Sequence, residues 1–355
     1  MTGTVMLASA AGVVALFVAV WLASLIVKDA SIVDVFWGVG FIVVAWVCFA
    51  VGHGAHDRRL LLALLVTVWG GRLAAHIGAR NLGKGEDRRY VEMRQRDGSR
   101  FWLTSLYRVF AVQAVVLWVI SLPLQAGASL GGGHGLRVLD AIGGGVWLVG
   151  FCFEAFGDRQ LVRFKADPAN SGRVMDRGLW RYTRHPNYFG DATMWWGLGL
   201  VALGAGGVAA WGLAGSAVDT LILTRVSGKP VLEKDIETRR PGYREYIERT
   251  SGFLPLPPRG VRSSGARAGT ATGTRLMSAS SALSRADTGP PDTGRAMVEE
   301  RAQPIRRTSP LRLLAAALAG AFGAFGVSGG AHVPKAPPAP AAATSSISAP
   351  ERADA

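Results

Sequence analysis

Apolar residues in this chain are gathered into long blocks, which short polar or basic segments separate. A helix of about 20 apolar residues crosses the hydrocarbon core of a bilayer, whereas an open strand cannot, because its backbone groups would lack partners there. The blocks therefore predict an all-α, polytopic membrane protein. We expect spans over residues 5–27, 32–51, 60–79, 105–124 and 138–156, followed by a longer apolar region, 192–223.

The longer region predicts two helices rather than one. Residues 192–223 exceed the roughly 20 that one span needs, and glycines lie near their centre. We expect a turn near residues 204–207, which brings the number of spans to about seven. The first apolar block has no basic segment before it and is longer than the apolar core of a cleavable signal, so we interpret it as a retained anchor.

Composition changes after Pro258 and divides the chain into two parts. We expect residues 1–258 to form one helical membrane domain. Residues 259–355 are rich in small residues, serine, proline and arginine and lack apolar periodicity, which is typical of a disordered tail. Residues 311–327 within it are weakly apolar, and an eighth marginal span, a fused segment and plain low complexity stay open for them.

The net charge of +14 is distributed unevenly along the chain. Lysine and arginine crowd into three segments, 80–108, 157–191 and 225–259. The connection between the fourth and fifth spans, residues 125–137, has Arg137 as its one lysine or arginine. The positive-inside rule therefore places the three basic segments and the C-terminus in the cytoplasm. Arg58 and Arg59 oppose this orientation. Anionic lipid or an anionic cofactor is a better partner for the basic segments than nucleic acid.

Cysteine and histidine usage predicts no metal centre. Cys48 and Cys152 both lie inside apolar spans, and the six histidines show no metal-ligand spacing. Two cysteines are too few for a Cys-rich metal site and do not predict a disulfide framework. We therefore expect neither a metal nor a structural disulfide.

The segment 178–191 is the densest polar cluster beside an apolar run. Charges near hydrocarbon usually mark a ligand or a water-filled path, and an interfacial loop whose arginines meet lipid phosphates is the alternative. Pro186 bars a helical conformation for His185, so we expect a bend and then a helix N-terminus, which suits a phosphate or carboxylate. The candidate binding residues are Arg181, Arg184, His185, Asn187, Tyr188 and Asp191.

Arg72, His76 and Arg80 recur at intervals of four residues, so a helix would stack them on one face. A basic face on a membrane helix needs anionic partners, although snorkelling to the interface is an alternative. The candidate partners are Asp34, Glu86 and Asp87. An alternative interpretation of Asp34 is a solvated acid at the start of a helix, where the helix dipole favours it.

Glu154 and Asp158 are also four residues apart and share a helix face. Like charges at this spacing repel unless a cation or a hydrogen-bonding ligand lies between them. A salt bridge to Arg181 or Arg184 is the alternative interpretation.

The string Arg184-His-Pro-Asn-Tyr-Phe-Gly190 resembles a signature of the steroid 5-alpha-reductase C-terminal domain superfamily. The resemblance covers about residues 20–258 and is closest to an uncharacterised bacterial branch. Similar elements of that branch are Asp34-x-x-Trp37-Gly38, Trp69-Gly-x-Arg72-Leu, Arg80-Asn81 with Glu86-Asp87-x-Arg89-Tyr90, Arg225…Lys234, and Arg240-Pro-Gly-Tyr243 with Tyr246. Isoprenylcysteine and phospholipid methyltransferases are related and have a similar Arg-His-Pro-x-Tyr-x-Gly string.

The resemblance implies NADPH or S-adenosylmethionine as the cofactor. The reductase element Asn-x-x-x-Asp-x-x-Leu-x-x-x-Arg reads Glu154…Asp158…Leu161…Lys165 here, and the Phe-Gly-Glu of reductases reads Phe-Gly-Asp191. It implies cofactor-binding roles for Asp158, Lys165, Arg181, Arg184, His185, Asn187, Tyr188 and Asp191. His76, Tyr90 and an acid paired with Arg72 stay open as the group that polarises a substrate carbonyl.

The leading hypothesis is a reductase that uses NADPH to reduce a carbon–carbon double bond of a steroid-like or isoprenoid lipid, in the inner membrane of a bacterial cell. One alternative is a methyltransferase that uses S-adenosylmethionine and acts on a lipid-borne acceptor. Another is a non-enzymatic membrane protein that binds lipid. The apolar residues encode substrate size poorly, so the sequence predicts no more than an apolar, lipid-like substrate.

Overall fold

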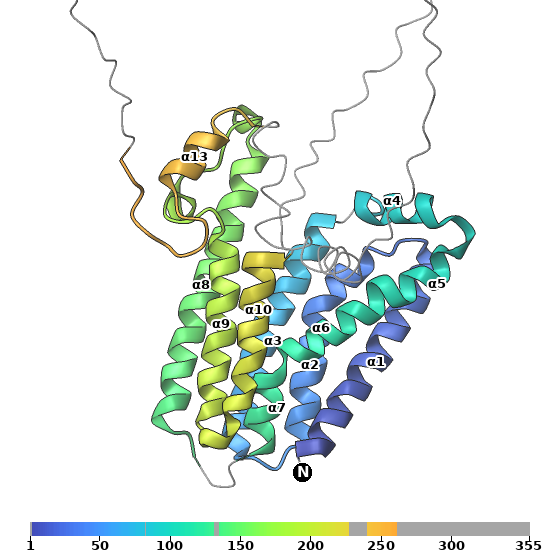
Figure 1. Ribbon diagram of the computed structural model, residues 1–355, viewed down its shortest axis with the longest axis vertical. Coiled ribbons are helices and arrows are strands. Elements are labelled where there is room, and N and C mark those ends of the chain that lie inside the picture. Colours follow the sequence, from blue (N-terminus) through green and yellow to red (C-terminus); the bar gives the residue numbers. More distant parts are fainter. Residues whose placement is uncertain (1, 82, 131–134, 227–239, 261–355) are drawn as a thin grey trace, which may run out of the picture.

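A computed structural model describes residues 2–81, 83–130, 135–226 and 240–260, which form a helical bundle (Figure 1). The only β-type pairing in this part of the chain is an isolated bridge between Thr183 and Ser251. The α-helices are α1 (Thr2–Val27), α2 (Ile32–Val51), α3 (His56–Asn81), α4 (Arg88–Asp97), α5 (Phe101–Ser105), α6 (Val112–Ile120), α7 (Leu122–Ser129), α8 (Val138–Ala166), α9 (Pro186–Leu203), α10 (Leu213–Leu221) and α13 (Tyr243–Arg249).

The predicted class, a polytopic helical membrane protein, is confirmed. Six helical stretches of the described residues are long and apolar enough to cross a membrane. They are Thr2–Val27, Ile32–Val51, His56–Asn81, Arg88–Ile120, Val138–Ala166 and Gly207–Val226. Helix α9 lies beside them and packs against α8 and α10. The predicted turn is also present, because α9 ends at Leu203 and the 3₁₀ helix η5 (Gly207–Gly212) begins after it.

Helices α8 and α9 pack backbone to backbone because glycines face each other. A Cβ at Gly150 would lie 2.5 Å from the carbonyl oxygen of Gly190, and one at Gly143 would lie 2.6 Å from that of Gly197. Small residues at a helix interface allow this close approach. As a result, the polar end of α8 is pressed against the first turns of α9.

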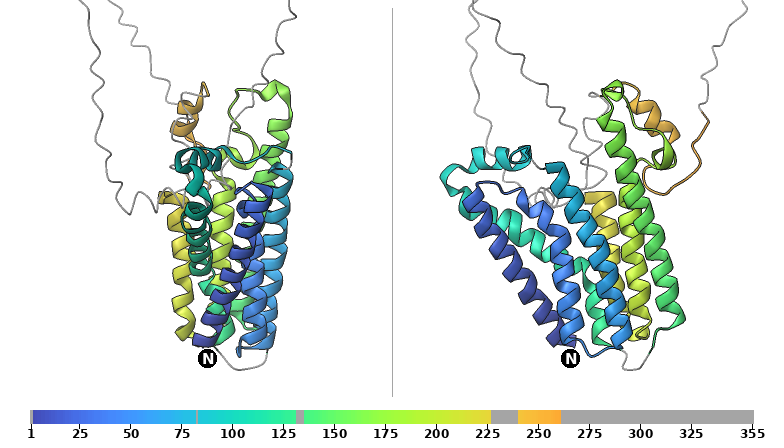
Figure 2. Two further views of the ribbon diagram at one scale, coloured as in Figure 1. Left: turned by 90° about the vertical axis from the view of Figure 1, so that its right-hand side faces the viewer. Right: turned by 180° about the vertical axis from the view of Figure 1, so that it is seen from behind.

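The fourth predicted span is not one straight helix. After α5 the chain forms a π-helical segment, η2 (Leu106–Ala111), then α6, and it breaks at Ser121 before α7. Pro123 stands in the first turn of α7. Figure 2 shows that α6 runs obliquely to its neighbours. The expectation that the connection between the fourth and fifth spans begins at residue 125 is wrong. Helix α7 continues to Ser129, and its residues from Pro123 onward are buried.

Both arginines that opposed the predicted orientation form hydrogen bonds within the fold. Arg58 is 1% exposed, and its Nε and Nη2 donate to the two carboxylate oxygens of Asp140 at 2.7 and 2.9 Å. Arg59 donates to the carbonyl oxygens of Gly54 and Phe49. This end of the bundle lies opposite α4 and α13 (Figure 1). Arg58 and Arg59 are therefore structural.

The fifth span is longer than predicted, since α8 continues past residue 156 to Ala166. Asp158 and Lys165 consequently lie on the same helix as Glu154. The predicted tail, 259–355, and its weakly apolar segment, 311–327, lie outside the described residues apart from 259 and 260. Residues 227–234 of the Arg225…Lys234 element also lie outside the described residues.

Candidate functional site

The centre of the candidate site is a hydrogen-bonded bridge between α3 and α8. Arg72 donates from Nη1 to Oε1 of Glu154 at 2.7 Å and from Nη2 to Oδ2 of Asp158 at 2.6 Å. The Trp69 indole donates to the other oxygen of Glu154 at 2.8 Å. The carboxyl of Glu154 is almost fully buried. The Arg72 guanidinium is thus the cation that the spacing of Glu154 and Asp158 requires. These two acids bond Arg72 instead of forming the alternative salt bridge to Arg181 or Arg184.

A small pocket opens beside this bridge and is bounded by α3, α8 and α9. Its lining consists of Leu73, His76, Ile77, Arg80, Glu154, Asp158 and Asn187. Nε2 of His76 lies 3.7 Å from Oδ2 of Asp158. The pocket therefore brings together two members of the predicted basic face, the acid pair and one residue of the segment 178–191.

The start of α9 has the conformation that Pro186 predicts. His185 is non-helical, with φ −139° and ψ 65°, and α9 begins at Pro186. The His185 ring stacks on Tyr188 with centroids 5.3 Å apart. Asn187, Tyr188 and Asp191 are buried, and the backbone of Asn187 lies next to Gly157 of α8. The Tyr188 hydroxyl and Oδ1 of Asp191 are buried with no hydrogen-bond partner among the described residues.

Arg184 takes a different role from the neighbouring His185. Its Nη1 donates to the carbonyl oxygens of Thr250 at 2.7 Å and Ile247 at 3.2 Å, and its backbone N–H donates to that of Ser251. Thr183 donates from Oγ1 to the carbonyl of Phe253 at 2.8 Å. These bonds dock α13 and the residues after it onto the segment before α9.

More contacts hold the same dock together. The Tyr246 hydroxyl donates to the carbonyl oxygen of Trp180, and Arg249 pairs with Asp176. Burial raises the pKa of Tyr246 above its ordinary value, so this phenol stays a neutral donor. Figure 1 shows α13 against the end of α8 that carries Lys165. The C-terminal segment 240–260 is thus part of the same structural unit as the string Arg184–Gly190.

Basic side chains from separate segments converge near the pocket. The charge of Lys165, at the end of α8, interacts with those of Arg240, Arg80 and Lys84. Lys165 and Lys84 are exposed, whereas Arg80 and Arg240 are half-buried. We refer to these four basic residues, of which Arg80 lines the pocket, as the pocket mouth. Arg181, the remaining predicted phosphate ligand, is exposed at the end of the 3₁₀ helix η4 (Gly178–Arg181).

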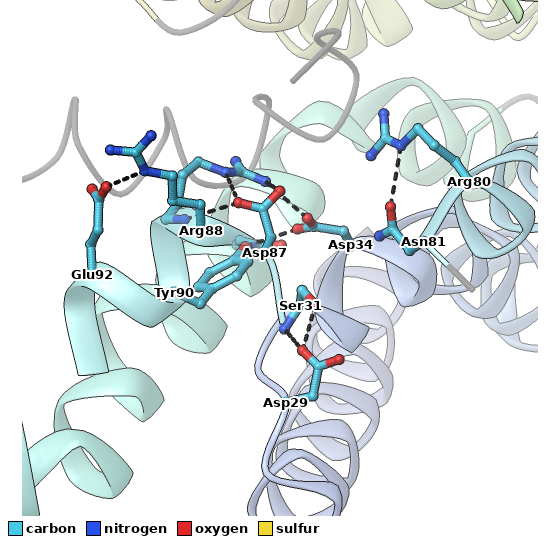
Figure 3. Close-up of polar contacts among 11 residues, drawn as sticks. Asp29, Ser31, Asp34, Arg80, Asn81, Asp87, Arg88, Tyr90 and Glu92 are labelled. Carbon is cyan, nitrogen blue, oxygen red and sulfur yellow. Dashed lines mark hydrogen bonds and ion pairs between the residues drawn. The ribbon is translucent and has the colours of Figure 1, made fainter. Parts of the chain in front are cut away.

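Tyr90 lies in a second cluster, shown in Figure 3. Its buried hydroxyl donates to Oδ1 of Asp34 at 2.9 Å, and Arg89 donates to Oδ2 at 3.1 Å. Arg89 also bonds Asp87. Burial would raise the pKa of the Asp87 carboxyl, but the hydrogen bonds and charge of Arg89 outweigh burial and hold that pKa below its ordinary value. Asp34 is buried and paired, so its interpretation as a solvated acid is wrong.

The comparisons with known proteins cover most of this bundle. Residues 20–250, which are more than half of the chain, match the model of the family described as "Protein of unknown function (DUF1295)". The chain belongs to this family. DUF1295 is associated with steroid 5-alpha-reductase-like proteins. A protein of Schizosaccharomyces pombe described as uncharacterized is 26% identical over 269 residues, or 66% of this chain and 75% of the relative. No solved structure matches.

In this DUF1295 protein the structure therefore divides the predicted site residues into groups. Arg72, His76, Asp158 and Asn187 meet at the pocket, with Tyr188 and Asp191 behind it. Lys165 lies at the mouth, Arg184 binds the C-terminal segment, and Tyr90 belongs to the Asp34 cluster.

Two groups near the site were not foreseen. Trp69 was noted only as part of a string, yet its indole is a donor to Glu154. Asp219 lies on α10, is 1% exposed, and interacts electrostatically with Asp191. The available signal was an acid within the apolar run 192–223, because ionisable residues inside membrane spans usually have a function.

Proposed function

We propose that this protein is an integral membrane reductase that uses NADPH to reduce a carbon–carbon double bond of an apolar, steroid-like or isoprenoid lipid. The observation that supports it best is the positive mouth formed by Arg80, Lys84, Lys165 and Arg240 beside the pocket. Clustered cations of this kind suit a ligand with several phosphate groups, and NADPH has three. We further propose the inner membrane of a bacterial cell, with the mouth on the cytoplasmic side, as the positive-inside rule favours.

The chemistry of the donor set fits a dinucleotide. The cations of the mouth would bind its phosphates, and Arg181 is exposed at the end of η4, shortly before α9 begins. Deeper in, the buried amide of Asn187 and the unpartnered atoms of Tyr188 and Asp191 offer hydrogen bonds to an uncharged ring and its carboxamide. A buried polar atom without a partner is costly, so a ligand that supplies one is favoured.

When bound, NADPH would supply the hydride. The protein's own part is to polarise the substrate carbonyl, to exclude water and to hold the reactants together. His76 lines the pocket and is the candidate polariser that is closest to it. Tyr90 donates a hydrogen bond to Asp34, and Arg72 donates hydrogen bonds to Glu154 and Asp158; neither residue lines the pocket.

A methyltransferase that uses S-adenosylmethionine is the second candidate, and a different observation favours it. The interior beside the pocket holds four carboxyl groups, from Glu154, Asp158, Asp191 and Asp219, around Arg72. Such a surplus of acids would tolerate the sulfonium cation of this cofactor. S-adenosylmethionine has no phosphate, however, so it leaves the cations of the mouth without partners.

Thermal unfolding of the full-length protein in detergent, with NADPH, NADH or S-adenosylmethionine added singly, separates these functions. A ligand at 100 times its dissociation constant adds about 2.7 kcal/mol to the free energy of unfolding. We expect NADPH to raise Tm most, because only NADPH has the additional 2′-phosphate. Stabilisation by S-adenosylmethionine alone would favour the methyltransferase. No response to any of the three would favour a non-enzymatic lipid-binding protein.

A further inference from the structure

Asp219 is an acid in the interior of the bundle that the pocket described above does not include. It lies on α10, is 1% exposed, and its Oδ2 has no hydrogen-bond partner among the described residues. Helix α10 packs against α6, α7 and α9. Neither α6 nor α7 contains an ionisable side chain. The acids that interact electrostatically with Asp219 are Glu154 of α8 and Asp191 of α9.

The register of α9 and α10 brings Asp219 level with Asp191. The Ser216 hydroxyl donates to the carbonyl oxygen of Trp195 at 2.6 Å, which fixes how the two antiparallel helices align. Asp191 precedes Trp195 by about one turn, and Asp219 follows Ser216 by about one turn. The two carboxyl groups interact electrostatically, as this alignment requires.

A third group with an unused polar atom lies beside this pair. Tyr188 precedes Asp191 by three residues on the same face of α9. It interacts electrostatically with Asp158 and Asp191, and also with Arg80 and Arg89. Its hydroxyl is buried without a partner, as is Oδ1 of Asp191. Asp191, Asp219 and Tyr188 thus each have a buried oxygen atom without a hydrogen-bond partner among the described residues. Two of these groups are carboxyls and the third is a phenol.

Charge balance indicates what this region holds. Arg72 donates hydrogen bonds to Glu154 and Asp158 and also interacts electrostatically with Asp191, so one guanidinium has to compensate several carboxyl groups. Two further carboxylates at this depth would place uncompensated charge in an apolar medium, which is strongly unfavourable. A carboxyl that keeps its proton is neutral and becomes a hydrogen-bond donor to its neighbour. The described residues include no group of three or more His, Cys, Asp or Glu side chains that could hold a metal ion. A proton on one of the two carboxyl groups would remove one of the charges.

We propose that Asp191 and Asp219 form a buried pair that stores an exchangeable proton beside Tyr188, and that this pair supplies the proton consumed in the neighbouring pocket. The second half rests on the proposed function. Reduction of a carbon–carbon double bond adds a hydride to one carbon and a proton to the other. The pair would lose one proton in each turnover, leave one carboxylate behind, and regain a proton from water. Glu154 lines the pocket and interacts electrostatically with both members of the pair.

Infrared spectroscopy of the full-length protein tests the storage without any cofactor. We expect a carboxylic acid C=O band at neutral pH that moves in D₂O, and we expect Asp219→Asn and Asp191→Asn each to weaken it. Asp97→Asn is the matched control, because Asp97 pairs with Arg96 and Arg108 at the other end of the site and should leave the band unchanged. The wild-type spectrum alone tests the inference, even if a variant does not fold. If the wild-type protein lacks this C=O band at neutral pH, the inference is overturned.

NADPH-dependent turnover tests the supply. Asp219→Asn should lower kcat by about tenfold or more with little change in KM, and most strongly at alkaline pH, where water delivers protons poorly. Asp219→Glu should restore much of the rate. An unchanged kcat for Asp219→Asn would overturn the supply role. If the wild-type band is present but no NADPH is oxidised, the proposed function fails while the storage stands, so the two failures are distinguishable.

Discussion

Arg72 and Glu154 are 82 residues apart in the sequence, and a 2.7 Å hydrogen bond joins them across α3 and α8. The same guanidinium reaches Asp158, so one cation satisfies two acids that would otherwise repel each other. This bridge sets the position of the pocket wall. It also explains why a basic helix face and an acidic helix face, both visible in the sequence, occur in one membrane protein.

Removal of the Arg72 guanidinium should destabilise the fold. Arg72→Ala leaves the buried Glu154 without its cation, and we expect a loss of about 3 kcal/mol in the free energy of unfolding, because an uncompensated buried charge remains. Thermal unfolding in detergent measures it. Arg88→Ala is the control, since Arg88 pairs with Glu92 at an exposed site and should cost less than about 1 kcal/mol. Equal losses for both variants would contradict the buried bridge.

The close packing of α8 on α9 predicts opposite effects for two glycines of α8. A Cβ at Gly150 would meet the backbone of Gly190, so Gly150→Ala should lower the free energy of unfolding by about 1–3 kcal/mol. A Cβ at Gly144 meets nothing within 4 Å, and Gly144→Ala should be neutral or stabilise by up to about 1 kcal/mol through helix propensity. Comparable Tm changes for the two variants would show that the glycines do not govern this contact.

The positive mouth predicts a selective loss of cofactor binding. Lys165→Gln and Arg240→Gln should each weaken NADPH binding by about tenfold, because each removes one charged hydrogen bond to a phosphate. The shift of Tm with NADPH concentration measures this. Arg244→Gln serves as the control, as Arg244 is exposed and pairs with Glu248 on α13. Equal weakening by Arg244→Gln would assign the effect to overall charge instead.

Arg184→Ala and His185→Ala should behave differently despite their adjacent positions. Arg184 bonds the carbonyl oxygens of Ile247 and Thr250, so its loss should release the C-terminal segment and expose Arg249 to trypsin. His185 stacks on Tyr188, so its loss should reduce stabilisation by NADPH while trypsin resistance persists. The rate of tryptic cleavage and the NADPH-dependent Tm, measured on both variants, check this. Cleavage that is equally fast in both would contradict separate roles.

Much of the site could be read from residue spacing. The four-residue spacing of Arg72 and His76, and that of Glu154 and Asp158, predicted shared helix faces, and both pairs occur as predicted. Which faces meet could not be predicted, because the candidate partners Glu86 and Asp87 are as acidic as Glu154. In the fold, Glu86 pairs with Arg94 and Asp87 with Arg89, and Glu154 reaches Arg72.

The membrane-spanning helices themselves were determined by the sequence alone. Long apolar blocks must form helices in lipid, because no other element satisfies its backbone groups there, and Pro186 begins α9 for a local steric reason. Only the tertiary structure decided that Arg184 binds the C-terminal segment and that Asp219 meets Asp191. Those relationships depend on how distant helices align, and alignment comes from the packing of small residues across an interface, which spacing within one helix does not encode.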